Sequence, residues 1–475
     1  TDMHRNRFTI IGHYLGIILL VMAACMTIPL LVEAQYHNAD NVRAFFLCML
    51  GTLFFGGLLY FSNRQPVARI SVDQCFLLLT LCWLSAGISA AMPLYLTDAR
   101  LDLADAIFEG VAGITTTNAT VMADLQGHTR GVLLWRSMLQ FIGGAGAIIL
   151  GLIFLPMMRI GGMQLFRTQS ADISAKTLPR LESQIRGILV IYAVLGFGGF
   201  LAYHTAGMNW FDALNHAMTS ISTGGFSTYD ANLGAFDTPA IHWVAIVLMI
   251  LGACPFILYL RAAAKNSTRI FTDTQVRTLV VLILAFTALL TVWLYLTKND
   301  LGAAEALRLS AVTITSTLTT TGYVGEDTIY WGQFAAMLIF FLSYLGGCTG
   351  STAGGLKIMR IQVLALHSRM QIKQLIYPHG AFTAKYGGTP LPRNIMRAVL
   401  VFTSIYVLTN TLLTMLLCLS GVEFQQALSA AASTIANLGP VIGTDNPVAF
   451  YTNLPARAEL LLSLGMLAGR LEIMT

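Results

Sequence analysis

Residues 105–120 have the sequence DAIFEGVAGITTTNAT, in which an acidic start leads through a half-length apolar helix to a turn rich in threonine. The same plan recurs three more times, each time between two long apolar segments. Ordinary amphipathic helices in outward loops are the alternative, but a polar loop would not need an apolar half-helix before its turn. The repeats therefore predict half-helices that enter the membrane and turn back. The other copies start at Asp212, Glu305 and Gln426 and reach the turns Ser222–Ser227, Thr319–Tyr323 and Ala436–Pro440.

The composition predicts that lipid surrounds most of the chain. Of 475 residues, 56% are hydrophobic and 11% are charged, whereas soluble domains have about 25% charged residues. The first apolar run, Phe8–Val32, exceeds the roughly 7 to 15 apolar residues of a signal peptide, so it is expected to be a transmembrane helix. Spanning segments of about 20 residues or more are expected near 8–32, 44–62, 74–97, 131–158, 186–208, 240–262, 277–297, 329–365, 395–420 and 455–475.

The charges predict the topology. Lys and Arg concentrate in residues 159–186, 261–277 and 357–397, which places these loops in the cytoplasm by the positive-inside rule. This rule accounts for the net charge of +5 without a nucleic-acid partner. The opposite loops are acidic and would enrich cations at an entrance. Their acidic residues are Asp98, Asp102, Asp105, Asp212, Asp230, Asp237, Glu326, Asp327 and Asp445.

No pattern of catalytic or metal-ligating residues stands out. The seven cysteines lack paired short spacings and the nine histidines are scattered, so neither a disulfide framework nor a zinc site is predicted. No set of Ser, His and acid converges on one membrane face. A membrane enzyme is therefore a poor alternative.

The turns suit a cation that sheds its water. Backbone carbonyls turned toward one axis can replace a hydration shell, and such turns need backbone angles that glycine reaches at little cost. Gly225, Gly322 and Gly439 stand at matching places and are expected to have positive φ. The negative ends of the half-helix dipoles would also face the ion. The candidate filter residues are Thr116, Thr117, Asn118, Thr223, Gly224, Gly225, Thr320, Thr321, Gly322, Asn437, Leu438 and Gly439.

A second irregular segment is expected within the apolar run 329–365. Residues 345–355, LGGCTGSTAGG, hold too much glycine for one helix. Irregular backbone at membrane depth is tolerated where it is buried in protein or lines a cavity; a glycine-packed helix crossing is the alternative.

Three basic residues lie in or beside apolar segments. Arg470 must reach a partner or water, because a charge at the centre of a spanning helix costs about 2.5 to 3.5 kcal/mol. The alternative for Arg470 is an extended side chain that reaches the inner interface. Arg136 and Lys357 are expected at helix ends, without a role in conduction.

Motifs spread over nearly the whole chain carry a family resemblance. They are Phe108–Gly110 before Thr115–Thr117, Gly143-Gly144, Arg159–Leu165, Gly224–Thr228, Gly346–Cys348 with Gly350–Thr352, Asn437–Pro440 and Gly469–Ile473. The chain resembles the Trk/Ktr/HKT superfamily of potassium transporters, and within it the Trk-type potassium-uptake membrane subunit. The resemblance implies an all-α polytopic membrane protein, in which two leading helices precede four helix–pore-loop–helix repeats around a pseudo-fourfold ion pore. The expected boundaries are 1–70 for the leading helices and 71–165, 166–265, 266–370 and 371–475 for the repeats.

The resemblance also implies roles and partners. K⁺ would be the transported ion, and the chain would form a homodimer in the bacterial inner membrane. A cytosolic nucleotide-binding regulatory subunit, a TrkA-like ring, would dock on the basic loops. The glycine-rich run would be an intramembrane gating loop, with Arg470 in the constriction. The implied gate residues are Gly346, Gly347, Gly350, Ser351, Thr352, Gly354, Gly355 and Arg470.

Two departures from the family pattern matter. The family usually has glycine where this chain has Asn118, which tolerates left-handed backbone angles but crowds one quarter of the ring. In related plant transporters a non-glycine residue here goes with sodium preference, so a sodium-permeable transporter is the alternative. The family's last helix also continues past the position of Thr475, so the chain is expected to be trimmed.

A carrier coupled to sodium or protons is the other transport alternative. Such a carrier should bury carboxylates at mid-membrane. Nearly every acidic residue here is expected in a loop or at a helix end, apart from Glu459 and Glu472 near Arg470. This distribution favours a channel-like pore.

Overall fold

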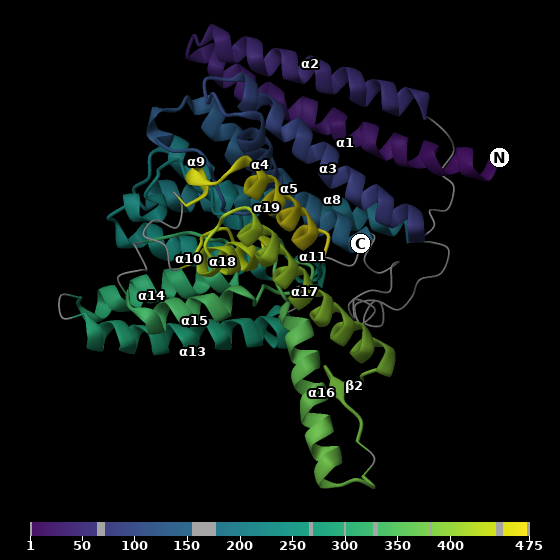
Figure 1. Ribbon diagram of the computed structural model, residues 1–475, viewed down its shortest axis with the longest axis vertical. Helices are drawn as coiled ribbons and strands as arrows, with labels where there is room; N and C mark the ends of the chain where they lie inside the picture. Colours follow the sequence, from purple (N-terminus) through teal and green to yellow (C-terminus); the bar gives the residue numbers. More distant parts are fainter. Residues whose placement is uncertain are drawn as a thin grey trace.

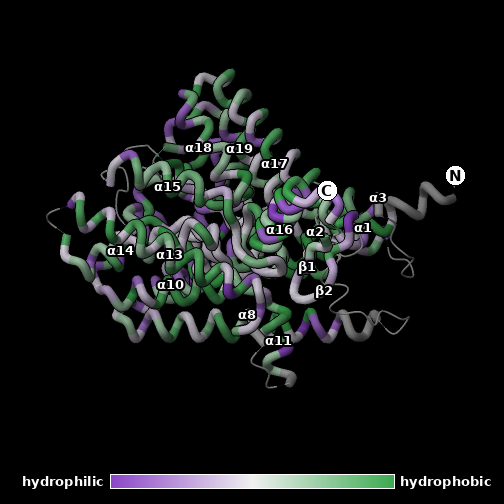
Figure 2. The backbone as a smooth tube through the Cα atoms, turned by 90° about the horizontal axis from the view of Figure 1, so that it is seen from below, coloured by the Kyte–Doolittle hydropathy of each residue, from purple (hydrophilic) through white to green (hydrophobic). Residues whose placement is uncertain are grey.

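Long helices make up most of the computed structural model, which describes residues 2–63, 72–153, 177–265, 269–298, 301–325, 331–380, 382–442 and 450–472. Seven helices in these ranges are long and apolar enough to cross a membrane, or eight if one bent pair is a single span. Hydrophobic residues lie on the outermost helices as well as inside the bundle (Figure 2). Val194, Phe197 and Leu284, for example, are each 63% exposed. Apolar surface on this scale needs lipid around it, which confirms the prediction of a polytopic membrane protein.

The first two helices form a hairpin along one side of the molecule (Figure 1). They are α1 (Asp2–Gln35) and α2 (Ala39–Ser62). Near the end of α1, the buried carboxylate of Glu33 accepts a hydrogen bond of 2.7 Å from the backbone N–H of Gly131. This bond joins the hairpin to the start of α5.

Four units follow, each with a helix, a half-helix and a second helix. The first unit holds α3 (Val72–Leu96), α4 (Leu103–Ile114) and α5 (Arg130–Ile153). The second holds α8 (Thr177–Thr205), α9 (Trp210–Ile221), α10 (Pro239–Ala253), α11 (Phe256–Lys265) and α12 (Arg269–Thr272). The third holds α13 (Thr274–Thr297), α14 (Ala303–Leu318), α15 (Gln333–Ser343) and α16 (Ile358–Ile376). The fourth holds α17 (Arg393–Leu419), α18 (Phe424–Ile435) and α19 (Ala456–Arg470).

A recurring close contact makes three of these units equivalent. A Cβ atom added to Gly143, Gly252 or Gly469 would lie 1.9, 2.5 or 2.1 Å from the carbonyl oxygen that ends the preceding half-helix. Those oxygens belong to Ile114, Ile221 and Ile435. Since no side chain fits there, each second helix crosses its half-helix at a glycine. The predicted architecture of two leading helices and four helix–pore-loop–helix repeats is confirmed.

One predicted span is wrong in its continuity. Residues 240–262 were expected to form one helix, but α10 and α11 meet at a bend of 89°. Pro255 has no N–H, and its ring pushes the preceding residue out of the helical region. Cys254 accordingly has φ −85° and ψ 153°. The predicted break within 329–365 is present, because α15 ends at Ser343 and α16 begins at Ile358.

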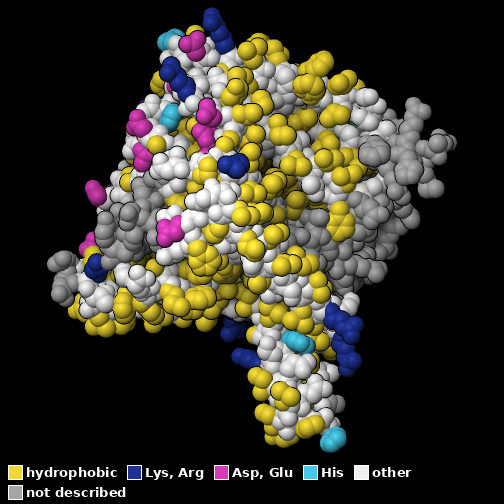
Figure 3. All heavy atoms as spheres, in the orientation of Figure 1, with side chains coloured by type: hydrophobic (Ala, Val, Ile, Leu, Met, Phe, Trp, Pro, Cys, Tyr) yellow, Lys and Arg dark blue, Asp and Glu magenta, His cyan; other side chains and the backbone are white. Residues whose placement is uncertain are grey.

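The third and fourth repeats are joined by an arm that leaves the bundle (Figure 1). After α16, strands β1 (Lys385–Tyr386) and β2 (Thr389–Pro390) form a small antiparallel pair, a departure from the all-α expectation. Figure 3 shows basic side chains and no acidic ones around this arm. Residues 328–422 contain no Asp or Glu, but seven basic residues. They are Lys357, Arg360, Arg369, Lys373, Lys385, Arg393 and Arg397.

Some sequence features fall outside the described residues. They are the motif Arg159–Leu165, the basic residues between 154 and 176, and the acidic residues Glu326, Asp327 and Asp445.

Candidate functional site

The four half-helices end in the same hydrogen-bonding pattern. In the first repeat, the N–H of Thr116 donates to Gly113 O at 3.1 Å and the N–H of Thr117 donates to Ala112 O at 2.8 Å. This pair of bonds, with a left-handed residue between helix and turn, is the Schellman motif. The equivalent second bonds are Gly224 N to Thr219 O at 2.8 Å, Thr321 N to Ser316 O at 2.9 Å and Leu438 N to Ser433 O at 2.8 Å.

The left-handed position is occupied by an unusual residue type in every repeat. It usually holds glycine, but here it holds Thr116, Thr223, Thr320 and Asn437, with φ between 50° and 56°. A β-branched residue in this region is a true outlier that persists only where the surrounding structure imposes it. Three threonines share this strain at equivalent places, whereas Asn437 adopts the left-handed region more readily. The repetition marks the turns as a functional candidate.

The glycines two residues further on confirm their predicted conformation. Gly225, Gly322 and Gly439 have φ of 82°, 80° and 107°. Asn118, at the matching place of the first turn, is not among the described residues with positive φ. Asn118 therefore does not adopt a left-handed conformation, and the backbone of the first turn differs from that of the other three turns.

The four turns meet in a closed ring. A Cβ atom on Gly225 would lie 2.0 Å from Thr321 O, and one on Gly322 would lie 2.1 Å from Leu438 O. A Cβ atom on Gly439 would lie 2.2 Å from the carbonyl oxygen of Asn118. The Cβ atom of Asn118 in turn lies 3.0 Å from the position that a Cβ atom on Gly225 would take. Each turn thus contacts the next in the order of the repeats. The turns are brought together, as the repeat pattern predicted.

Asn118 fills part of the ring. Its side-chain amide donates a hydrogen bond of 2.6 Å to Gly322 O in the third turn. Its backbone N–H donates to Leu438 O at 3.4 Å. The predicted crowding of the ring is therefore present, and it takes the form of a side chain that reaches the opposite turn.

The carbonyl groups of the turns divide into two sets. Those of Gly225, Gly322 and Gly439 accept bonds, from the Asn232 amide at 3.1 Å, the Asn118 amide at 2.6 Å and the Tyr451 hydroxyl respectively. A carbonyl oxygen has a second lone pair, so such a bond does not exclude a cation. By contrast, the carbonyls at the left-handed position have no hydrogen-bond partner among the described residues. They are those of Thr116, Thr223, Thr320 and Asn437, one from each repeat.

A buried ion pair supports the first two turns. Glu109 in α4 and Arg136 in α5 are 0% and 1% exposed, and their side chains approach to 2.7 Å. Glu109 also accepts bonds from Thr120 Oγ1 and Val121 N, while Arg136 donates to Ser227 O at 3.2 Å. Arg136, expected at a helix end, instead lies inside α5 as half of this pair. Glu109, in the middle of α4, is an exception to the expectation that nearly every acidic residue lies in a loop or at a helix end. A lone glutamate within an apolar half-helix was the available signal, since a buried charge needs a partner.

The glycine-rich run forms a loop directly against the turns of the ring. The side chain of Thr352 lies 3.0 Å from that of Thr223 (Oγ1 to Oγ1), and the N–H of Gly354 donates to Thr320 Oγ1 at 2.7 Å. A Cβ atom on Gly354 would also lie 2.2 Å from Ala436 O. The strained threonines of the second and third turns thus contact the loop through their hydroxyl groups.

The loop also completes the hydrogen bonds of the broken helix. The bend between α10 and α11 leaves backbone groups without intrahelical partners. Loop residues supply those partners through three bonds. They are Cys348 N to Ala253 O at 2.9 Å, Thr352 N to Gly252 O at 3.3 Å and Phe256 N to Gly350 O at 3.0 Å.

Two basic side chains donate hydrogen bonds to adjacent backbone carbonyls of the loop. Arg470 donates to Thr352 O at 2.8 Å, and the ammonium group of Lys357 donates to Ala353 O. Arg360 pairs with Glu472 close by. Arg470 therefore has a partner inside the protein, and Lys357, expected only at a helix end, shares its task.

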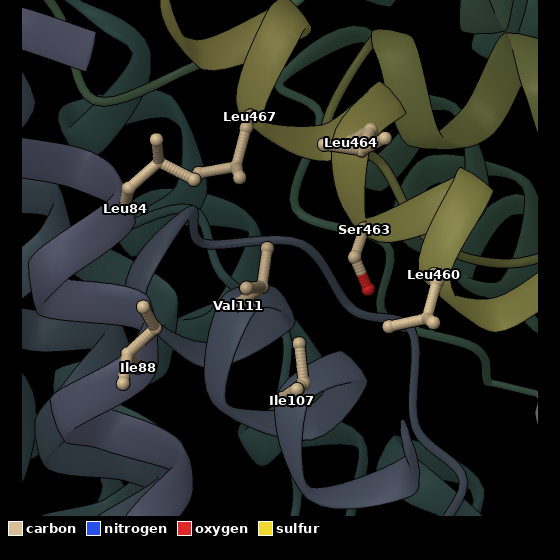
Figure 4. A pocket seen from close by; sticks show the side chains of 8 residues that line it. All are labelled: Leu84, Ile88, Ile107, Val111, Leu460, Ser463, Leu464 and Leu467. Atoms are coloured by element: carbon tan, nitrogen blue, oxygen red, sulfur yellow. The ribbon is translucent and has the colours of Figure 1, made fainter. Parts of the chain in front are cut away.

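The pocket in Figure 4 lies beside the site but offers it nothing polar. It measures about 200 Å³ and lies between α3, α4 and α19. Its one polar lining side chain, Ser463, donates instead to Glu459 O in its own helix at 2.9 Å. Among the described residues, no group of three or more His, Cys, Asp or Glu could hold a metal ion.

Comparison with known proteins links this geometry to transport. The model of the TrkH family, described as "Cation transport protein", matches residues 41–475. The Trk system potassium uptake protein TrkI of Halomonas elongata is 38% identical over 479 residues, covering all of this chain and 96% of the relative. TrkH of Escherichia coli K12 is 31% identical and covers 98% of this chain and 97% of the relative. The crystal structure of the potassium transporter TrkH from Vibrio parahaemolyticus superimposes with a TM-score of 0.89 at 31% identity, covering 98% and 97% of the two chains.

Proposed function

Because this chain belongs to the TrkH family of cation transport proteins, we propose that it is the potassium-translocating membrane subunit of a Trk-type uptake system. The observation that carries the proposal is the closed ring of four turns, each ending a half-helix in the same way. The proposed filter consists of the residues Thr116, Thr117, Asn118, Thr223, Gly224, Gly225, Thr320, Thr321, Gly322, Asn437, Leu438 and Gly439. Asn118 and Leu438 belong to it although neither is among the described residues with positive φ.

The proposed filter works by replacing the water shell of the ion. Each turn would provide one carbonyl ligand, from Thr116, Thr223, Thr320 or Asn437. A cation between these four oxygens gains ligands without breaking protein hydrogen bonds. The half-helices also direct their negative ends, each worth about half a charge, toward the ring. A potassium ion is thus stabilised by fixed dipoles rather than by a carboxylate.

The proposed gate is the loop beneath the ring. Gly346, Gly347, Gly350, Ser351, Thr352, Gly354 and Gly355 would close the path, with Arg470 holding Thr352 O. A positive charge beside the path raises the energy of a passing cation. Opening would require the loop to leave both Arg470 and the broken helix.

The basic arm is the proposed docking surface for a cytosolic nucleotide-binding regulatory subunit of the TrkA-like type. It lacks acidic residues from 328 to 422, and its far end exposes Leu375 and Tyr377 by 81% and 62%. We place the chain in the bacterial inner membrane as a homodimer without enzymatic activity. The proposed repeat boundaries remain 70/71, 165/166, 265/266 and 370/371, the last of which falls inside α16.

Sodium permeation, or cation transport coupled to sodium or protons, is the second candidate function. Asn118 favours this candidate, because the backbone of the first turn differs from that of the other three turns. Proton coupling through Glu109 is disfavoured, because its carboxylate oxygens are already bonded to Arg136, Thr120 and Val121.

Reconstitution into liposomes tests the function. We expect a potassium gradient to drive uptake of K⁺. The reversal potential in mixed K⁺ and Na⁺ should then show a higher permeability for K⁺. Equal permeability to both ions would favour the second candidate, and no cation flux with or without a regulatory subunit would contradict both.

A further inference from the structure

A glutamine in α5 clamps the second turn of the ring. Gln140 is fully buried and lies one helical turn after Arg136. Its Nε2 donates to Gly224 O at 2.8 Å, and its Oε1 accepts from the N–H of Phe226 at 3.0 Å. One amide thereby holds the residues on both sides of Gly225.

The direction of this amide follows from its partners. Exchanging its nitrogen and oxygen would set two acceptors against each other at Gly224 O and two donors against each other at Phe226 N. Nε2 also lies 3.5 Å from Thr117 O in the first turn. Gln140 thus reaches two of the four turns and fixes the second.

The clamp explains an exception in the sequence of the second turn. The residue after the left-handed position is Thr117, Thr321 or Leu438 in the other turns, but Gly224 in this one. A Cβ atom on Gly224 would lie 2.3 Å from Gln140 Oε1. The glutamine therefore occupies the space of a side chain, and it leaves a Gly-Gly pair that is highly flexible when unsupported.

Gln140 has no polar counterpart in the second and fourth repeats. It lies three residues before Gly143, whose equivalents are Gly252 and Gly469. The residues three before these glycines are Met249 and Met466, both buried. A methionine has no N–H to donate, so the clamp belongs to the first repeat.

We propose that Gln140 is a positioning residue that orients the peptide groups of the second turn and thereby sets the discrimination between K⁺ and Na⁺. The inference rests on the proposed function. Selectivity depends on the number and placement of carbonyl ligands. A turn whose peptides can rotate adapts to the smaller ion, which raises the relative permeability of Na⁺.

The test compares Gln140→Met and Gln140→Glu with the unaltered chain in liposomes. Methionine is the residue of the equivalent positions, while glutamate keeps the acceptor for Phe226 N and loses the donor to Gly224 O. We expect the ratio of K⁺ to Na⁺ permeability to fall about fivefold, the size of one lost hydrogen bond. Ser137→Ala is the control, because Ser137 is buried in the same helix and its hydroxyl donates to Leu133 O within that helix.

Three outcomes would overturn the inference. One is that both Gln140 variants, eluting as intact protein, keep the ratio of the unaltered chain. Another is that flux falls while the ratio stays unchanged, as expected for a merely structural role. If the unaltered chain itself does not prefer K⁺, the proposed function fails first and the inference fails with it.

A rescue experiment gives a second readout. Gly224→Thr copies the third turn but collides with Gln140, so we expect uptake to be lost. Adding Gln140→Ala removes the collision and should restore part of the uptake. Full uptake by Gly224→Thr alone, or no recovery in an intact double variant, would contradict the clamp.

Discussion

The turns of the ring and the glycine-rich loop are both irregular backbone deep in the bundle, yet they are supported differently. Each turn is closed by hydrogen bonds to its own half-helix, as Thr117 N to Ala112 O illustrates. Besides bonds within itself, such as Gly346 N to Leu356 O at 2.9 Å, the loop bonds to other elements, among them Ala253 in the broken helix and Arg470 in α19. Support within one element is retained when neighbours move. We therefore expect the ring to keep its shape if the loop moves.

The largest expected effect is on the ring itself. Gly439→Ala places a Cβ atom 2.2 Å from Asn118 O, so we expect potassium uptake to be abolished, measured as growth of an uptake-deficient strain at low potassium. Gly207→Ala is the matched control. Gly207 has φ of 113°, close to the 107° of Gly439, but no atom of the described residues lies within 4 Å of its added Cβ. Equal growth of both variants would contradict the tight ring.

Release of the loop should have the opposite sign. Arg470→Ala removes the bond to Thr352 O and a positive charge beside the path, so we expect basal uptake to rise several-fold without a regulatory subunit. Rubidium influx measures this rise. Arg457→Ala, at the exposed start of the same helix, should leave influx unchanged. Unchanged influx in the Arg470 variant would remove this residue from the gate.

A smaller effect is expected where the ring departs from symmetry. Asn118→Gly removes the side chain that bonds Gly322 O, so the ratio of K⁺ to Na⁺ permeability should rise, read from reversal potentials. Asn118→Ala loses the same amide but keeps a Cβ atom. A shift shared by both variants assigns the effect to the amide bond, and a shift in neither would show that the crossing side chain does not set selectivity.

The smallest effect is expected at the bend between α10 and α11, whose backbone bonds to the loop. Pro255→Ala restores an N–H, so α10 and α11 can approach a continuous helix in which Gly252 and Ala253 bond within the helix instead of with the loop. We expect a modest rise in basal rubidium influx. Pro239→Ala, at the first position of α10, is the control, since proline there disturbs no helical bond. A fall in influx would contradict the coupling between bend and loop.

The sequence was sufficient for the features that depend on local pattern. The four half-helices and the positive φ of Gly225, Gly322 and Gly439 follow from the spacing of apolar residues and glycines. The break between α15 and α16 follows from glycine content. In each case the signal and the structure lie within a few residues of each other.

Features that depend on distant partners were missed. Gln140 and Arg136 resemble ordinary polar residues of a helix until the second turn is placed beside them. The left-handed threonines contradict intrinsic preference, because tertiary contacts impose their conformation. The bend at Pro255, by contrast, has a local signal, since a proline after Gly-Ala-Cys is typical of a helix end.

The bend between α10 and α11 has a consequence for biosynthesis. Gly252 and Ala253 emerge from the ribosome long before Thr352 and Cys348, whose N–H groups bond to their carbonyls. Carbonyls without partners in hydrocarbon cost several kcal/mol each. The nascent second repeat must therefore keep this segment hydrated, and its insertion is complete only when the third repeat arrives.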